Sequence, residues 1–126
     1  MAKMHQNIKI QVTTHYLEEQ SDINEERFMF AYTITINNTG KIGVQLIGRH
    51  WIITDANNSV QEVRGIGVVG EQPRLAPGEG YEYTSGTPLS TPIGTMKGSY
   101  QMVTDDGTEF DVPIDEFLLS VPGALH

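Results

Sequence analysis

The sequence contains no cysteine, so disulfide bonds and thiolate metal sites are excluded throughout the chain. Because small secreted domains are more often stabilised by disulfides, we predict a cytoplasmic protein. No apolar run approaches the roughly 20 residues that a membrane-spanning helix needs. Residues 1–10 are polar and lack the apolar segment of a secretory signal peptide, so we expect neither export nor a membrane partner.

Basic residues are also scarce, with 8 lysines and arginines against 16 acidic residues and a formal net charge of -8. This charge repels phosphate backbones, so nucleic-acid binding is disfavoured. The acidic surface either keeps a cytoplasmic protein soluble or attracts a basic partner or a divalent cation. The 126 residues, 38% of them hydrophobic, suffice for one packed domain over residues 1–126 and leave no room for a second core.

Apolar residues do not recur at helical spacing, but an alternation with a period of two runs through most of the chain. The longest alternation covers residues 28–36, and its second face is mildly apolar, which predicts a central strand. Trp51 lies in an apolar strand and is expected to fill the core. One short helical turn is expected at residues 21–26, with Asp22 as its cap. The predicted strands are residues 8–12, 28–36, 44–47, 51–54, 59–63, 80–84, 96–103, 109–114 and 116–121.

Residues that tolerate positive φ separate these strands, at 37–40, 57–58 and 105–107. Pro77 and Gly78 fit the two central positions of a type II turn. Short strands at intervals of roughly 8–12 residues are typical of sandwiches and barrels. We therefore predict an all-β fold, a two-sheet β-sandwich of the immunoglobulin or fibronectin type III kind.

Gly65, Gly67 and Gly70 form a G-x-G-x-x-G string. In dinucleotide-binding folds such glycines let the backbone approach a pyrophosphate at the start of a helix. Here Pro73 and Pro77 follow, so no helix can continue. Three glycines also suit a bulge, a sharp bend or close strand packing, and this structural interpretation is favoured over direct phosphate binding.

The glycine string also predicts a contact surface. Val68 and Val69 are adjacent, so in an extended chain they point to opposite faces and one is exposed. Gly67 and Gly70 have no side chains to screen their backbone from a partner strand. The predicted site is therefore Gly65, Gly67, Val68, Val69 and Gly70, with a protein partner or a second copy of the chain as its occupant. A nucleotide polyphosphate, a pyrophosphate or a divalent cation is the alternative ligand.

No catalytic set stands out in the sequence. The string Thr84-Ser85-Gly86 lacks the first glycine of a nucleophile elbow, because Tyr83 occupies that position. The histidines are dispersed and lack the spacing of a zinc motif: His5, His15, His50 and His126. We predict a protein that is not an enzyme and has neither a cofactor nor a metal site.

Long ordered blocks cover nearly the whole chain: AYTITI at 31–36, RHWIITD at 49–55, GIGVVGEQP at 65–73, LAPGEGYEYTSG at 75–86, TPIGTMKGSYQM at 91–102 and FLLSVPGALH at 117–126. In these blocks the chain resembles the ApaG family. The resemblance implies one ApaG domain with a fibronectin type III-like sandwich and no disulfides. It also implies a role in cobalt and magnesium tolerance, which must be indirect because no segment can span a bilayer.

The ApaG resemblance bears on binding as well. In bacteria the family's gene often neighbours a diadenosine tetraphosphate hydrolase, and the glycine motif, here Gly65, Gly67 and Gly70, is the family's suggested phosphate site. Related domains in eukaryotic F-box proteins and in a polymerase-associated protein are thought to mediate protein contacts. No catalytic residues are established for the family. The resemblance therefore implies a protein-binding module first and a phosphate-ligand binder second.

Overall fold

The computed structural model describes residues 7–124, and within this range strands dominate. The strands are β1 (Ile8–Tyr16), β2 (Phe28–Asn38), β3 (Val44–Asp55), β4 (Val60–Ile66), β5 (Arg74–Leu75), β6 (Gly80–Leu89), β7 (Ile93–Thr104) and β8 (Glu109–Ser120). Two short 3-10 helices, η2 (Glu18–Gln20) and η3 (Ile23–Glu25), connect β1 to β2. Nothing helical in residues 7–124 has the length and apolar character needed to cross a membrane. His5 and His126 lie outside the described residues.

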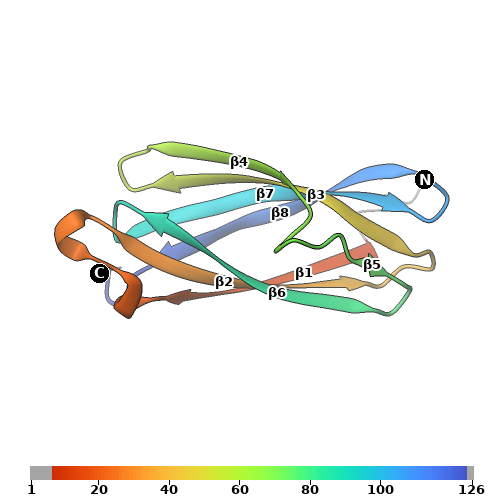
Figure 1. The fold of residues 1–126 in the computed structure, drawn as a ribbon, viewed down its shortest axis with the longest axis horizontal. Helices are drawn as coiled ribbons and strands as arrows, with labels where there is room; N and C mark the ends of the chain where they lie inside the picture. Colours follow the sequence, from red (N-terminus) through yellow and green to blue (C-terminus); the bar gives the residue numbers. More distant parts are fainter. Residues whose placement is uncertain (1–6, 125–126) are drawn as a thin grey trace.

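Two antiparallel sheets stack into a sandwich (Figure 1). The smaller sheet has the order β1-β2-β6, and the larger has the order β4-β3-β7-β8. The two-residue strand β5 pairs with the start of β3. The predicted two-sheet β-sandwich is confirmed. The predicted central position of residues 28–36 is also confirmed, because β2 lies between β1 and β6.

Two pairs of predicted strands are each one strand in the structure. Residues 44–47 and 51–54 both belong to β3, whose register with β7 shifts between Leu46 and Gly48. Residues 109–114 and 116–121 merge in the same way, since β8 runs to Ser120 and shifts its register with β7. A bulge moves the side-chain alternation by one residue, so a continuous strand looks interrupted in sequence. The prediction of separate strands at these places is therefore wrong.

The core lies between the two sheets and is centred on Trp51, which is 2% exposed. The indole makes edge-type contacts with Tyr32, Tyr100 and Phe117 at ring-centroid distances of 5.5, 6.2 and 5.9 Å. Such tilted pairs are the arrangement that aromatic rings prefer. The hydroxyls of Tyr83 and Tyr100 lie 2.5 Å apart in this core, and burial raises the pKa of both phenols. The predicted burial of Trp51 is confirmed.

Two of the predicted turns, at residues 21–26 and at Pro77-Gly78, are present in the structure. Asp22 caps η3, because its Oδ1 accepts hydrogen bonds from two backbone N–H groups of that helix at 3.1 and 3.3 Å. The helix is a single 3-10 turn, within the predicted range of residues 21–26. Gly78 has a φ of 86°, and the N–H of Glu79 donates to the carbonyl of Ala76 at 2.9 Å. This geometry agrees with the type II turn predicted at Pro77 and Gly78.

Candidate functional site

The glycine string lies at one edge of β3, where β4 ends. β4 and β5 pair with the same edge of β3, and the chain between them carries the glycines (Figure 1). Gly65 is still inside β4 and pairs with Arg49 of β3. Gly67 and Gly70 lie in the connection that follows. We call residues 65–70 the glycine loop.

The tip of the glycine loop is a tight two-residue turn. The N–H of Val68 donates to the carbonyl of Glu71 at 2.8 Å, and the N–H of Glu71 donates back to the carbonyl of Val68 at 2.9 Å. The two residues between them, Val69 and Gly70, have φ values of 43° and 82°. Two positive φ values in a row are typical of type I′ turns, which favour asparagine and glycine. A β-branched valine in this region is an outlier, so Val69 is held in a strained conformation.

The first two glycines make close contacts, and the contact of Gly67 is with backbone. A Cβ on Gly65 would lie 2.7 Å from the guanidinium of Arg49. A Cβ on Gly67 would lie 2.3 Å from the carbonyl oxygen of Glu71, and the φ of Gly67 is +65°. The contact of Gly67 is the close backbone packing that the sequence suggested as one explanation of the motif. Gly67 is therefore needed for the local fold, whatever the loop binds, while a side chain at Gly65 would require Arg49 to move.

Arg49 fixes the glycine loop against β3. Its Nη1 donates to the carbonyls of Ile66 and Gly67 at 3.1 and 2.8 Å. The N–H of Gly67 donates to the carbonyl of Ile47 at 2.8 Å, and the side-chain Nε2 of Gln72 donates to the same carbonyl at 2.9 Å. Sequence reasoning missed Arg49. Its role depends on the register that places it opposite Gly65, which only the β3–β4 pairing reveals.

The structure places the predicted site residues together but changes their arrangement. Val68 is fully buried and Val69 is 53% exposed, so the prediction that one of the two is exposed is confirmed. The predicted extended conformation is wrong, because the chain turns back at Val69 and Gly70. The predicted open backbone is wrong at Gly67, whose N–H and carbonyl are both hydrogen-bonded. At Gly70, by contrast, an added Cβ would meet open space.

Exposed apolar side chains gather around the glycine loop. Val69 lies at the tip, and Ile66, at the end of β4, is 79% exposed. Ile47 is 37% exposed and precedes Gly48, which pairs with Ile66. We call Ile47, Ile66 and Val69 the loop patch. A cluster of exposed apolar side chains within a polar surface is typical of interaction sites.

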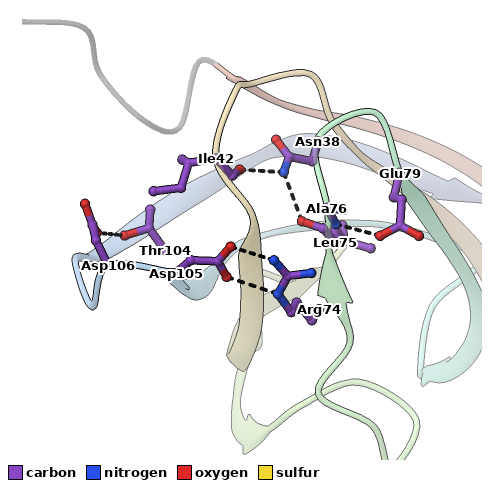
Figure 2. A network of polar contacts seen from close by, with 9 residues as sticks. All are labelled: Asn38, Ile42, Arg74, Leu75, Ala76, Glu79, Thr104, Asp105 and Asp106. Atoms are coloured by element: carbon purple, nitrogen blue, oxygen red, sulfur yellow. Dashed lines mark hydrogen bonds and ion pairs between the residues drawn. The ribbon is translucent and has the colours of Figure 1, made fainter.

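The segment after the glycine loop is anchored by polar contacts (Figure 2). Arg74 donates from Nε and Nη2 to the two carboxylate oxygens of Asp105 at 3.0 and 2.5 Å. This guanidinium holds the pKa of the Asp105 carboxyl below its ordinary value. The Nδ2 of Asn38 donates to the carbonyls of Leu75 and Ile42 at 3.0 and 2.9 Å. These contacts tie β5 to the ends of β2 and β7, so the glycine loop is fixed at both of its ends.

Two histidines that the sequence singled out, His15 and His50, lie in different sheets. The Nε2 of His50 and an oxygen of Glu62 lie 2.5 Å apart on neighbouring strands, and His50, together with Arg64, lowers the pKa of the Glu62 carboxyl. His15 is in β1 of the smaller sheet, so the structure does not bring it to His50. Among residues 7–124, no three His, Cys, Asp or Glu side chains are arranged to hold a metal ion.

The fold defines a β-sandwich protein of the fibronectin type III kind, with an ordered glycine turn at one sheet edge. A family model described as the ApaG domain matches residues 18–104. Protein ApaG of Nitrosospira multiformis is 63% identical over 119 residues, which are 94% of this chain and 94% of the relative. Protein ApaG of Nitrosomonas eutropha is 61% identical over 120 residues, covering 95% and 94%. The chain belongs to the ApaG family.

Solved structures agree with this assignment. The crystal structure of a Bordetella pertussis protein described as ApaA is 58% identical, with a TM-score of 0.89 over 92% of this chain and 94% of that chain. A second X-ray structure, from a structural genomics consortium, is 48% identical with a TM-score of 0.93, over 98% and 94%. The resemblance to the ApaG family is thus confirmed by sequence and by fold.

Proposed function

We propose that this chain is a small cytoplasmic binding module, not an enzyme, and that it contacts a protein partner through the loop patch. The observation that carries the proposal is the position of Val69. An apolar, half-exposed side chain is held at the tip of a tight turn, with a φ that disfavours valine. Strain of this kind tends to persist at functional sites, where the surrounding structure enforces it.

The loop patch is preorganised for binding. Val68 anchors the turn in the core, two backbone hydrogen bonds close it, and Arg49 holds the carbonyls that precede it. A partner that covers Val69 and Ile66 therefore has little loop entropy to remove, which favours affinity. The net charge of -8 favours a partner with basic residues around its contact surface.

The role in cobalt and magnesium tolerance is part of the same proposal. We assign it to the protein partner, because the chain offers a contact surface and no three-ligand metal arrangement among residues 7–124. The partner would act on the ions, and this module would act on the partner. Such a role is indirect, as the family resemblance implied.

The alternative ligand is a nucleotide polyphosphate or a pyrophosphate. Within residues 7–124 we find no acceptor for the N–H groups of Val69 and Gly70, and these two donors are what an anion would use. The carboxylate of Glu71 follows directly and accepts a hydrogen bond from the hydroxyl of Tyr81 at 3.4 Å. A negative charge beside the turn opposes phosphate, and no helix supplies a dipole. Protein binding is therefore the favoured function.

Val69→Lys tests the loop patch directly. Lysine is unbranched at Cβ, so it suits the positive φ better than valine and should leave the fold intact. We expect the variant to bind the partner at least about tenfold more weakly, because it places a charge in an apolar contact. The measurement is capture of proteins from the native cytoplasm on immobilised wild type, followed by titration of the captured partner against both forms.

Ile23→Lys is the matched control, because Ile23 is 69% exposed and lies in η3, away from the glycine loop. This variant should capture the partner as the wild type does. Circular dichroism would establish that both variants are folded. Equal capture by wild type and folded Val69→Lys would show that the turn serves the fold alone.

A further inference from the structure

β4 forms one edge of the larger sheet, since within residues 7–124 it pairs with β3 alone (Figure 1). Two hydrogen bonds, one just before β4 and one just after it, fix which residues of β4 direct their backbone groups toward β3. Before β4 the N–H of Asp55 donates to the carbonyl of Ser59 at 3.1 Å, and after it the N–H of Gly67 donates to the carbonyl of Ile47 at 2.8 Å. Both bonds fit the single register that joins β3 and β4.

In an antiparallel pair the hydrogen-bonded positions alternate with positions whose backbone groups point away. Counting from Ser59 and from Gly67 gives the same alternation along β4. The residues directed toward β3 are Gln61, Val63 and Gly65. The N–H groups of Val60, Glu62, Arg64 and Ile66 point to the open edge. The carbonyls of Val60, Glu62 and Arg64 point there as well, whereas the carbonyl of Ile66 already accepts a hydrogen bond from the Nη1 of Arg49.

The other strands at the sheet edges are less suited to pairing. β8 contains Pro113, which offers no donor, and the acidic residues Asp111, Asp115 and Glu116, which repel an identical edge. β6 contains Pro88, and β1 packs against β8 across the sandwich. β4 has no proline, and its charged residues are one acid and one base. In a chain of net charge -8, this balanced edge is the one that a second copy can approach.

The sequence of β4 is complementary to itself. If two copies pair antiparallel about a two-fold axis at Val63, Glu62 of each copy faces Arg64 of the other. The same register places Val60 opposite Ile66 of the second copy, and these side chains are 64% and 79% exposed in the single chain. In both facing pairs the register brings residues of the hydrogen-bonding type together, and the carbonyl of Ile66 is the one group that already accepts a hydrogen bond, from Arg49. Charge, apolar contact and backbone pairing thus agree on one register.

We propose that β4 is a self-association edge and that two copies form a symmetric dimer through antiparallel β4–β4 pairing. The larger sheets of the two copies then join into one continuous sheet. Because both copies use the same surface, the assembly ends at two copies, and β4 is paired on both of its sides. The dimer goes beyond the proposed function, because it needs no other protein. The pairing covers Ile66 of the loop patch but leaves Val69, at the tip of the glycine loop, outside the paired residues.

A charge-swap series tests the register. Glu62→Arg places two arginines face to face in the dimer, and Arg64→Glu places two glutamates face to face, so each variant should dimerise at least about tenfold more weakly. The double variant restores the opposite-charge pairs and should dimerise as the wild type does. An equimolar mixture of the two single variants should form a heterodimer, because both arginines of one copy then face glutamates of the other copy. Sedimentation equilibrium over a concentration series of the full chain measures all four samples.

Arg27→Glu is the control for Arg64→Glu, since it replaces arginine by glutamate at an exposed position outside β4. It should leave the dimer unchanged, and circular dichroism would show that every variant is folded. A wild type that stays monomeric up to about 1 mM, where weak association becomes visible, would overturn the proposal. Single variants that dimerise like the wild type, or a mixture that stays monomeric, would also overturn it. None of these variants changes Val69, so the test of partner binding through Val69 stays separate from the test of the dimer.

Discussion

Replacement of Trp51 by alanine should lower the free energy of unfolding by about 3–5 kcal/mol. Trp51 is 2% exposed and contacts Tyr32, Tyr100 and Phe117 between the two sheets. Its removal loses the transfer free energy of the indole and leaves a cavity that the rigid strands on both sides cannot fill. Among residues 7–124 no other side chain contacts as many aromatic rings, so no other truncation in this core should cost more.

Trp51→Phe separates ring packing from the indole itself. The Nε1 of Trp51 is buried and has no hydrogen-bond partner within the described residues. A buried donor without a partner is unfavourable, so phenylalanine removes a cost while it keeps most of the edge contacts. We therefore expect Trp51→Phe to lose less than half as much stability as Trp51→Ala in urea unfolding followed by circular dichroism. A loss below about 1 kcal/mol for Trp51→Ala would show that the indole is not central to the core.

Replacement of Asn38 by alanine should cost about 3 kcal/mol, although the residue is polar. Asn38 is 1% exposed, and its Nδ2 donates to the carbonyls of Ile42 and Leu75 (Figure 2). Its Oδ1 also accepts from the N–H of Gly40 at 3.0 Å, so Asn38 satisfies three backbone groups. Alanine leaves these groups without their partner at a largely buried position. Each such group costs about 1–3 kcal/mol, reduced where water can enter.

Asn57→Ala is the matched control for Asn38, because Asn57 is exposed in the turn between β3 and β4. Its replacement should change stability by no more than about 0.5 kcal/mol in the same urea unfolding experiment. The difference between the stability losses of Asn38→Ala and Asn57→Ala measures what the buried hydrogen bonds of Asn38 contribute. If Asn38→Ala were as mild as Asn57→Ala, the polar contacts around β5 would contribute little to the fold.

Local patterns in the sequence were sufficient to predict much of the sandwich. The alternation of residues 28–36 reports directly on β2, because successive side chains of a strand face opposite sides. Pro77-Gly78 and Asp22 also define their turns with local chemistry alone. Bulges were not predicted, since a shift of register is a property of two strands and leaves only an interruption in the pattern of one.

The candidate site was predicted only in part, and for the same reason. The glycine spacing located the loop, but the backbone of Gly67 is closed by Ile47 and Arg49, and these contacts depend on β3–β4 pairing. Asn38 was expected only as a turn residue. Its buried hydrogen bond to the carbonyl of Leu75 could not be predicted, because Leu75 lies 37 positions further along the chain.

Amide NMR during titration with pyrophosphate separates a protein-contact turn from a phosphate site most directly. The N–H groups of Gly67 and Val68 are hydrogen-bonded within the chain. Within residues 7–124 the N–H groups of Val69 and Gly70 have no acceptor, and the acidic residue Glu71 follows Gly70 directly. We therefore expect the amide signals of residues 65–70 to stay in place up to about 10 mM pyrophosphate, a concentration at which even a weak specific site would fill. Saturable shifts of the Val69 and Gly70 signals, with a Kd below about 1 mM, would contradict the assignment of this loop to protein binding.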